Sequence, residues 1–351
     1  MFPLLEEPHG CPVCASERLR PLHVYRVKPR TQIAQVANLA LMGCERCGVS
    51  FSHPLPTDAE LDNYYSGTYW QERRPEDMDD RTGGRRERII RLRGIEVDLL
   101  APHLQLPRTR TPTVLDFGCG SGEYLDAFAD RGWQTVGLEP GEIGEQTAKR
   151  HRMVAEIPAE ETFDLVILNH VLEHLKDPVA TLERIAAATY GGGYIFASVP
   201  NLRRLPEHGR LSYVMNGTHI VSYTLSGLRS VLGLAGYEVV QHFDQPEWDE
   251  HHGQKAIRLP VLARNVGGRR EPEGEPLAEA IASLLDYAGE QEEPEGERAR
   301  TDPEEVARLR REKKQAKKER REQQASEPPE RAAGPVARLA RRVLAEPPGG
   351  S

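Results

Sequence analysis

The sequence predicts an α/β protein built on a mostly parallel sheet with helices on both faces. Three observations support this prediction. Strand-like and helix-like segments alternate between about residues 85 and 265. One of the strands, 163–168 (FDLVIL), is apolar at every position except Asp164, as expected of a strand that is buried on both faces. A glycine-rich turn at 118–122 joins another strand directly to a helix.

The elements of this region follow one another in a regular order. Apolar residues at helical spacing predict helices over 85–100, 123–131, 178–188 and 225–234. Pro178 lies at the start of the third helix, and Gly236 follows the last. Short apolar runs predict strands over 113–116, 135–138, 163–168, 194–199, 237–243 and 256–264. No helix separates the last two strands, so we expect an antiparallel pair at the edge of the sheet.

Composition places the 351-residue chain among globular proteins that fold in water. Charged residues make up 28% of it, mean hydropathy is −0.58, and no apolar run reaches the ~18 residues of a membrane helix. A formal net charge of −8 argues against a globally basic nucleic-acid binder. Residues 1–7 (MFPLLEE) show no basic segment followed by an apolar one, so we expect a cytoplasmic protein.

Four of the five cysteines form two C-x-x-C pairs. Cys11 and Cys14 make the first pair, and Cys44 and Cys47 the second. This spacing suits four thiolates around one tetrahedral Zn²⁺, with a β-hairpin between the pairs. Redox-active thiols or unpaired buried cysteines are the alternatives. We expect a structural zinc ribbon over residues 1–60, because such a site contributes folding energy and nothing suggests an open coordination position.

The C-terminal part changes character beyond Gly267. Residues 271–297 carry ten acidic residues and no Lys or Arg, whereas 308–321 carry nine basic and two acidic ones. Segregated charge of this kind predicts a largely disordered tail over 266–351 with short helices. Amphipathic spacing around Leu277 and around Val336 marks two short helices that are able to dock on a protein partner or on the body of the protein.

The glycine-rich turn carries the strongest functional signal. A strand leads into Asp116, then into Gly118, Gly120 and Gly122, and then into a helix. Glycines let a ligand approach the backbone closely, and the helix N-terminus offers free N–H groups. A carboxylate at the first position would repel a pyrophosphate but suits a ligand with an ammonium group. The order of strand, acid and helix therefore favours a ligand site over a simple turn.

This segment resembles motif I of class I S-adenosylmethionine-dependent methyltransferases, and the similarity extends over residues 85–265. Further landmarks are the stretches 137–140 (GLEP), 163–175 (FDLVILNHVLEHL) and 191–201 (GGGYIFASVPN). The resemblance implies a Rossmann-like methyltransferase domain that binds S-adenosylmethionine, with the carboxylate of Glu139 on the ribose hydroxyls. The cofactor-binding residues it implies are Asp116, Gly118, Cys119, Gly120, Gly122, Glu139, Pro140, Asn169 and Tyr69.

The N-terminal part is similar to that of deoxysugar C-methyltransferases and related small-molecule methyltransferases. The resemblance rests on the paired cysteines, Pro54-Leu55-Pro56-Thr57 and a tyrosine-rich segment, 64–70. It implies that residues 61–84 form a lid or linker, with Tyr65 and Tyr69 at the cofactor pocket or simply packed. One departure from the sequence pattern of this group weakens the case for C-methylation. Where the sugar enzymes carry a Tyr-His-Glu-His cluster, residues 216–219 read Asn-Gly-Thr-His, so O- or N-methylation stays open.

Methyl transfer from a sulfonium needs a positioned acceptor and a base that removes its proton. His219 and His170 are the candidate catalytic bases, since histidine titrates near neutral pH. The function expected is methylation of a small molecule, such as a sugar nucleotide, glycan or natural-product intermediate. The alternatives are a nucleic-acid methyltransferase that uses the zinc ribbon and the basic tail, and a non-catalytic scaffold that binds the cofactor. The fourth strand ends in Asn169-His170-Val171-Leu172 and lacks the motif of base-amino methylation, which argues against a nucleic-acid substrate.

Overall fold

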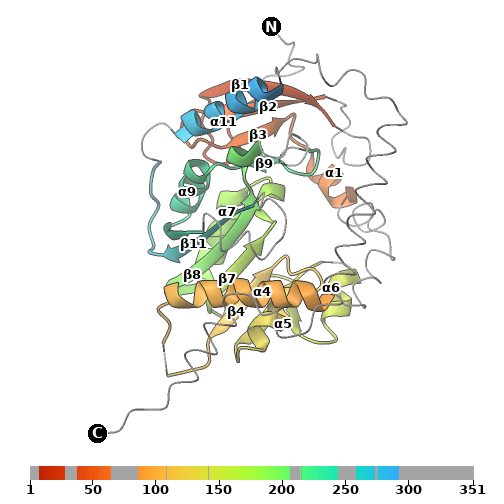
Figure 1. Cartoon of the computed structure of the whole chain (residues 1–351), viewed down its shortest axis with the longest axis vertical. Helices are drawn as coiled ribbons and strands as arrows, with labels where there is room; N and C mark the ends of the chain where they lie inside the picture. Colours follow the sequence, from red (N-terminus) through yellow and green to blue (C-terminus); the bar gives the residue numbers. More distant parts are fainter. Residues whose placement is uncertain are drawn as a thin grey trace, which may run out of the picture. The chain divides into compact units, whose positions relative to one another are not determined.

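The computed structural model describes residues 8–27, 38–64 and 86–291, except 108, 141, 206–213, 215, 244–257 and 273–275. The first 291 residues form one compact unit. The described part of this unit contains a central seven-stranded sheet and a smaller four-stranded sheet. Figure 1 shows both sheets, with the smaller one formed largely by the N-terminal part of the chain.

The central sheet has the predicted mostly parallel architecture. Its strand order is β10-β11-β8-β7-β4-β5-β6, and β4 to β8 run parallel to one another. β11 is antiparallel to both β8 and β10, which confirms the expected antiparallel pair. The bounds are β4 Thr113–Phe117, β5 Gln134–Leu138, β6 Arg152–Val154, β7 Phe163–Asn169, β8 Thr189–Pro200, β10 Tyr237–His242 and β11 Arg258–Asn265.

Two details of this sheet differ from the prediction. The short strand β6 was not predicted, because a three-residue segment with one charged residue gives little periodic signal. The strand predicted over 194–199 begins earlier, so that Gly191, Gly192 and Gly193, which lie between it and the predicted helix 178–188, are inside β8. Gly192 has φ +82°, and the pairing of β7 with β8 is irregular near this point. The glycines therefore let the strand bend rather than end.

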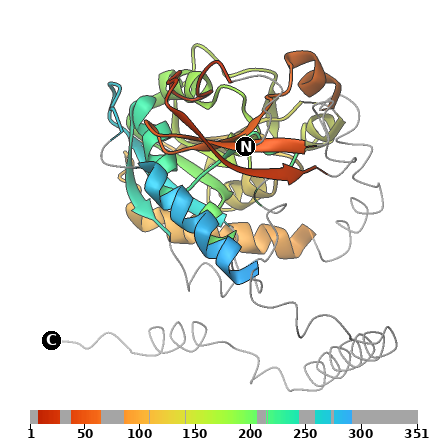
Figure 2. The same cartoon turned by 90° about the horizontal axis from the view of Figure 1, so that it is seen from above.

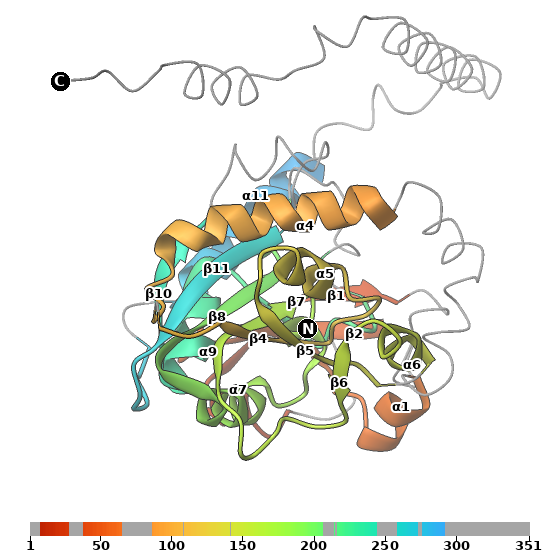
Figure 3. The same cartoon turned by 90° about the horizontal axis from the view of Figure 1, so that it is seen from below.

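Side chains alternate between the two faces of the sheet, and both faces are covered. On one face Val114, Leu165 and Phe196 pack against helices α4 (Arg86–Leu100) and α5 (Glu123–Ala129). On the other face Leu115 and Val166 pack against α7 (Pro178–Ala187) and α9 (Leu225–Leu234). Figure 3 shows these helix pairs on opposite sides of the strands. Burial on both faces explains the apolar run Leu165–Leu168 within β7.

Side-chain caps fix where two of these helices begin. The carboxylate of Asp177 accepts a hydrogen bond from the N–H of Ala180 at the start of α7, and Thr224 does the same for Gly227 at the start of α9. A shorter helix, α6 (Glu142–Thr147), follows β5. Helix α1 (Asp58–Asn63) follows the N-terminal sheet, and 3-10 turns span Ala101–His103, Leu172–His174 and Leu202–Arg204.

The smaller sheet combines three strands from the N-terminal part with one from the later part of the chain. Its strands β1 (Leu19–Arg26), β2 (Asn38–Cys44) and β3 (Ser50–His53) come from the N-terminal part, and β1 and β2 form the predicted antiparallel pair. The fourth strand, β9 (Val221–Ser222), comes from the region just before α9. The N-terminal sheet is thus completed by a strand from far along the chain.

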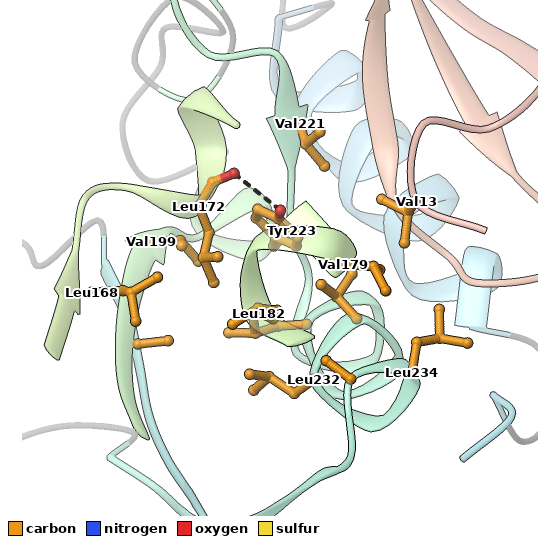
Figure 4. Close-up of a cluster of buried hydrophobic side chains, with 14 of the residues drawn as sticks. Val13, Leu168, Leu172, Val179, Leu182, Val199, Val221, Tyr223, Leu232 and Leu234 are labelled. Carbon is orange, nitrogen blue, oxygen red and sulfur yellow. Dashed lines mark hydrogen bonds between the residues drawn. The ribbon is translucent and has the colours of Figure 1, made fainter. Parts of the chain in front are cut away.

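One hydrophobic core runs through the N-terminal segment and the central domain. Val13 packs in the same buried cluster as Val179 and Leu182 of α7 and Leu232 of α9 (Figure 4). The hydroxyl of Tyr223 lies in this cluster and donates a hydrogen bond to the carbonyl oxygen of Leu172 at 3.2 Å. Because these contacts are apolar and fully buried, the N-terminal segment is packed as part of the unit rather than tethered to it.

The expected tail does not begin as an unpacked segment. Helix α11 (Pro276–Gln291) packs on the N-terminal sheet, with Leu277 and Ala280 buried beside Leu41 of β2 (Figures 1 and 2). The carboxylate of Glu279 accepts hydrogen bonds from the N–H and the hydroxyl of Ser226 at the start of α9. The amphipathic spacing around Leu277 thus corresponds to a helix that docks on the body of the protein, whereas the sequence analysis favoured a disordered tail here. Residues 292–351, including the basic stretch 308–321, lie outside the described residues.

Among the helices that the structure describes, none combines the length and the apolar character needed to cross a membrane.

Candidate functional site

The glycine-rich turn is shaped by backbone conformations that favour glycine. Gly118, Gly120 and Gly122 have φ of +78°, +52° and +79°, in the left-handed region. A Cβ on Gly118 would lie 2.7 Å from the side chain of Val171, whereas one on Gly120 would meet no atom within 4 Å. Gly118 therefore permits close packing, and Gly120 leaves open space beside the backbone. Gly122 caps the N-terminus of α5.

Two carboxyl groups lie at the carboxyl ends of adjacent strands, beside this turn. Glu139 follows β5, and its Oε2 accepts a hydrogen bond from the Gly120 N–H at 2.8 Å. Asp116 lies on β4, where its side chain is 3% exposed. Burial raises the pKa of Asp116 to about 8, against the attraction of Arg93, and the carboxylates of Glu123 and Glu139 add to the rise. Asp116 is thus a buried acid that a cationic ligand would ionise.

The turn opens into a cavity of about 560 Å³. This volume falls in the ~300–1,000 Å³ range of small-molecule sites. The cavity lies beyond the carboxyl ends of β4, β5 and β7, where parallel α/β sheets bind their ligands. Its walls are formed by Ile89, Arg93, Phe117, Gly118, Cys119, Gly120, Ser121, Glu123, Leu138, Glu139, Pro140, Ile143, Asn169, His170, Val171, His174 and Leu175.

His170 lines the cavity and is hydrogen-bonded to a buried glutamate behind it. His170 directly follows β7 with φ +58°, a conformation that is uncommon for a residue with a side chain. Its side chain is 41% exposed, and its Nδ1 lies 2.9 Å from Oε1 of Glu173, whose side chain is 1% exposed. Burial favours a raised pKa for Glu173, but the hydrogen bond and the charge of His170 outweigh it and lower the pKa to about 2. A buried carboxylate therefore orients an accessible imidazole.

His219 lies deeper than the sequence suggested. It is not among the described residues that line the cavity, and its ring packs edge-on against that of His174, with centroids 4.9 Å apart. Burial and the neighbouring His174 lower its pKa to about 4. Nδ1 of His219 lies 2.9 Å from the carbonyl oxygen of Val214. Direct proton exchange with a ligand in the cavity is thus easier for His170 than for His219, which stays a candidate base by prediction alone.

A cation in the cavity wall was missed by the sequence analysis. Arg93 of α4 lines the cavity, and its guanidinium donates hydrogen bonds to the buried carboxylate of Glu96 at 2.8 and 3.0 Å. Arg258 of β11 bonds the same carboxylate at 2.7 Å and lies 3.5 Å from Oδ1 of Asn169. Tyr124 donates a hydrogen bond to Glu96 as well. The alternating charge of α4 resembles an ordinary solvated helix, so only the fold shows that these charges are buried.

The structure brings together most of the residues predicted to bind the cofactor. Gly118, Cys119, Gly120, Glu139, Pro140 and Asn169 line one cavity together with the candidate base His170. Asp116 lies beneath the turn, within interaction range of the lining residues Arg93, Glu123 and Glu139. Gly122 supports the turn from α5. Tyr69 and the rest of the proposed lid, 65–84, lie outside the described residues.

The four paired cysteines converge as predicted. Their sulfur atoms all lie within 4.8 Å of one another, with Cys11 3.6 Å from Cys47 and Cys14 3.5 Å from Cys44. Tetrahedral Zn²⁺ with Zn–S bonds of about 2.3 Å places its sulfur ligands about 3.8 Å apart. Ala15 and Gly48, each directly after the second cysteine of a pair, have positive φ and donate N–H bonds back to the first cysteine of that pair. Two tight backbone turns thus present four thiols to one point.

Comparisons with known proteins agree with this geometry. Residues 85–242 match the family model described as a methyltransferase domain. The ubiquinone biosynthesis O-methyltransferase of Stutzerimonas stutzeri is 31% identical over 123 residues, covering 30% of this chain and 51% of that protein. The protein of the same name from Pseudomonas paraeruginosa is 34% identical over 103 residues, covering 25% and 44%. The chain thus spans about half the length of the curated relatives it matches, or less.

Among solved structures, the 1,6-didemethyltoxoflavin-N1-methyltransferase of Burkholderia thailandensis aligns with a TM-score of 0.44 and 20% identity. The alignment covers 67% of this chain and 98% of that one. The family match spans the central sheet as far as β10 and includes the glycine turn and the cavity walls. Residues 85–242 therefore form a class I S-adenosylmethionine-dependent methyltransferase domain.

Proposed function

We propose that the protein transfers a methyl group from S-adenosylmethionine to a hydroxyl group of a small molecule. One observation carries the proposal: a single cavity is lined both by the glycine turn with Glu139 and by the accessible imidazole of His170. A donor site and a proton acceptor that share one cavity are what group transfer between two small molecules requires.

The residues on the donor side fit the cofactor. When bound, S-adenosylmethionine supplies a methyl group activated by a positively charged sulfur. Asp116 ionises beside the ammonium group of the cofactor, which relieves the burial of a protonated acid. The open side of Gly120 accepts the ligand against the backbone. Glu139 exchanges its hydrogen bond with the Gly120 N–H for the pentose hydroxyls. Arg93 is the cation placed to pair with the carboxylate of the cofactor.

His170 is the residue that accepts the proton of the acceptor hydroxyl group. Nδ1 of His170 faces the carboxylate of Glu173, so the neutral ring holds its proton on Nδ1 and keeps a lone pair on Nε2. Nε2 takes the proton of the acceptor hydroxyl as the oxygen attacks, and the buried Glu173 carboxylate stabilises the imidazolium that forms. The acceptor oxygen would gain the methyl group that bound S-adenosylmethionine supplies, and the sulfur would keep the electron pair of the broken S–C bond. Asp116 thus interacts with the cofactor, whereas Glu173 supports the base, His170.

The acceptor is inferred from the relatives and from the cavity. The relatives are named for O-methylation in ubiquinone biosynthesis, which favours a small hydroxylated acceptor over the sugar nucleotide or glycan expected from the sequence. Likeness to the deoxysugar C-methyltransferases stays a prediction for the N-terminal part. The four clustered thiols hold a structural Zn²⁺ in this proposal, because their spacing fits tetrahedral coordination and they lie in the shared core.

A methyl-transfer assay with a panel of phenols, sugar nucleotides and free sugars tests the proposal by the mass of the methylated product. We expect His170→Gln to lower kcat by about 10²–10⁴-fold, the usual contribution of a general base, with little change in S-adenosylhomocysteine affinity. His103→Ala is the control, since His103 is exposed and lies outside the cavity wall. Full activity of His170→Gln would show that His170 is not the base. Consumption of the cofactor without methylation of any compound in the panel would overturn the proposed acceptor class.

A further inference from the structure

A second group of metal-ligand side chains lies beside the cavity, separate from the four cysteines. Glu173, His174 and His219 each offer one ligand atom, and these atoms all lie within 4.8 Å of one another. Glu173 and His174 belong to the 3-10 turn after β7, and His219 comes from the segment just before β9. Residues about 45 positions apart in the sequence are therefore brought to one point by the fold.

The hydrogen bonds of the two imidazoles are those of metal ligands. Nδ1 of His174 lies 2.8 Å from the carbonyl oxygen of Thr218, and Nδ1 of His219 lies 2.9 Å from that of Val214. A carbonyl oxygen can only accept, so both rings carry their proton on Nδ1 and have the lone pair on Nε2. Metal-bound histidines almost always donate their other N–H in this way, which fixes the tautomer and the orientation of the ring.

The carboxylate adds an independent observation. Glu173 is 1% exposed, and while its Oε1 pairs with His170, its Oε2 has no hydrogen-bond partner among the described residues. A buried carboxylate oxygen without a partner is expensive, at ~1–3 kcal/mol or more, and such an atom calls for an ion or a water. An ion bound by His174 and His219 would satisfy it without disturbing the bond to His170.

We propose that Glu173, His174 and His219 bind a divalent transition-metal ion, with Zn²⁺ the best match, at the wall of the cavity. Two imidazoles and one carboxylate are a ligand set of catalytic zinc sites, which keep a fourth position open. Ligands 2.0–2.2 Å from a tetrahedral ion stand about 3.3–3.6 Å apart, so the three side chains need to move together by about an ångström. Nitrogen ligands select this class of ion over Mg²⁺ or Ca²⁺.

The location of the site beside the cavity suggests which ligand would fill the open coordination position. His174 lines the cavity alongside His170, whereas Glu173 and His219 lie behind it. An ion held there is available to an oxygen atom of a molecule in the acceptor part of the cavity, and it would lower the pKa of a bound hydroxyl. The metal site itself does not depend on the methyl-transfer proposal, because bound metal is measured without any turnover.

The test counts zinc in the full-length protein after equilibration with micromolar Zn²⁺ and removal of the excess. The wild-type protein is expected to hold two Zn²⁺ per chain, one in each site. Glu173→Gln and His219→Ala are each expected to hold one, as is Cys44→Ser, which removes a ligand from the other site. His151→Ala is the matched control, because this mostly buried histidine pairs with the carboxylate of Asp126 outside the cluster and should leave two.

The results separate the alternatives even if one variant folds poorly. One Zn²⁺ per wild-type chain, lost in Cys44→Ser, would overturn the proposal without recourse to any variant of the cluster. Two Zn²⁺ per chain in both Glu173→Gln and His219→Ala would also overturn it, because the second ion would then lie elsewhere. Circular dichroism of each variant checks the fold, and Glu173→Gln, the more conservative change, decides if His219→Ala is unfolded. Loss of one equivalent in a folded Glu173→Gln variant supports the site.

Discussion

Replacing Asp116 with Asn is expected to stabilise the ligand-free protein while weakening its binding of S-adenosylhomocysteine. The two effects have one cause. Burial raises the pKa of Asp116 to about 8, so near neutral pH the folded protein holds a proton on this carboxyl group. The unfolded chain has released it, because the ordinary pKa of the group is 3.8. Asn has nearly the same shape but carries no ionisable group. Its folding therefore lacks the free-energy penalty that arises because the unfolded chain releases this proton and the folded protein keeps it.

The size of the effect follows from the difference between the two pKa values. Each pH unit between them changes the free energy of unfolding by about 1.4 kcal/mol. At pH 7 the penalty in the wild-type protein is therefore on the order of 4 kcal/mol. The sign is fixed by the raised pKa of the folded state: the penalty is absent below about pH 4, grows as the pH rises, and levels off near pH 8.

Urea unfolding of the ligand-free proteins at pH 5, 6 and 7 measures this difference. The advantage of Asp116→Asn should grow with each pH unit, and calorimetry should show its affinity for S-adenosylhomocysteine reduced at least tenfold. Asp164→Asn is the matched control, because Asp164 is also a buried aspartate but is bonded by Arg110 at 2.6 and 2.7 Å. That variant should lose stability. Equal stability of Asp116→Asn and wild type at all three pH values, with unchanged ligand affinity, would refute the reasoning.

Three further substitutions test other parts of the structure. Cys44→Ser should abolish zinc binding by the four-cysteine cluster and lower the melting temperature of the whole unit, because the cysteines lie in the shared core; an unchanged melting temperature would contradict that. Gly118→Ala should weaken S-adenosylhomocysteine binding, since its Cβ would meet Val171 at 2.7 Å, whereas Gly132→Ala, at φ +79° in open space, should cost only about 1 kcal/mol of stability and leave binding intact. Leu277→Asp should destabilise the protein by about 2–4 kcal/mol in denaturant unfolding, and wild-type stability would mean that α11 does not pack on the sheet.

The methyltransferase domain could be predicted from local patterns because each pattern has a local cause. The apolar sequence of β7 reflects burial on both faces, and the glycines at 118, 120 and 122 reflect positive φ. The acidic residues at 116 and 139 could be singled out because they lie at the carboxyl ends of parallel strands. The family match over residues 85–242 confirms this part of the prediction. The convergence of the four cysteines follows in the same way from the spacing within each pair.

Contacts between distant segments were beyond the sequence analysis. Nothing in Val221 or Ser222 shows that they pair with Ser50 and Phe51 to complete the N-terminal sheet. The docking of α11 depends on a surface built by β2, so the sequence analysis favoured a flexible tail over a docked helix.

The environments of charged and titratable side chains were also beyond the sequence analysis. Arg93 and Glu96 look like a solvated helical pair until the fold buries Glu96 and places Arg93 in the cavity wall. Likewise, the depth of His219 behind His174 is fixed by packing that no single segment specifies. In each case the residue type was visible in the sequence, but its environment was decided by a partner far along the chain.

A crystal structure of the full-length protein with S-adenosylhomocysteine gives the most direct test of the cavity as the donor site. We expect the amino-acid moiety to lie against residues 118–122 above Asp116, and Glu139 to have left the Gly120 N–H for the two pentose hydroxyls. The side chain of His170 should remain accessible within the same cavity. A ligand bound elsewhere, or a complex in which Glu139 keeps its bond to Gly120 and contacts no hydroxyl, would contradict the assignment.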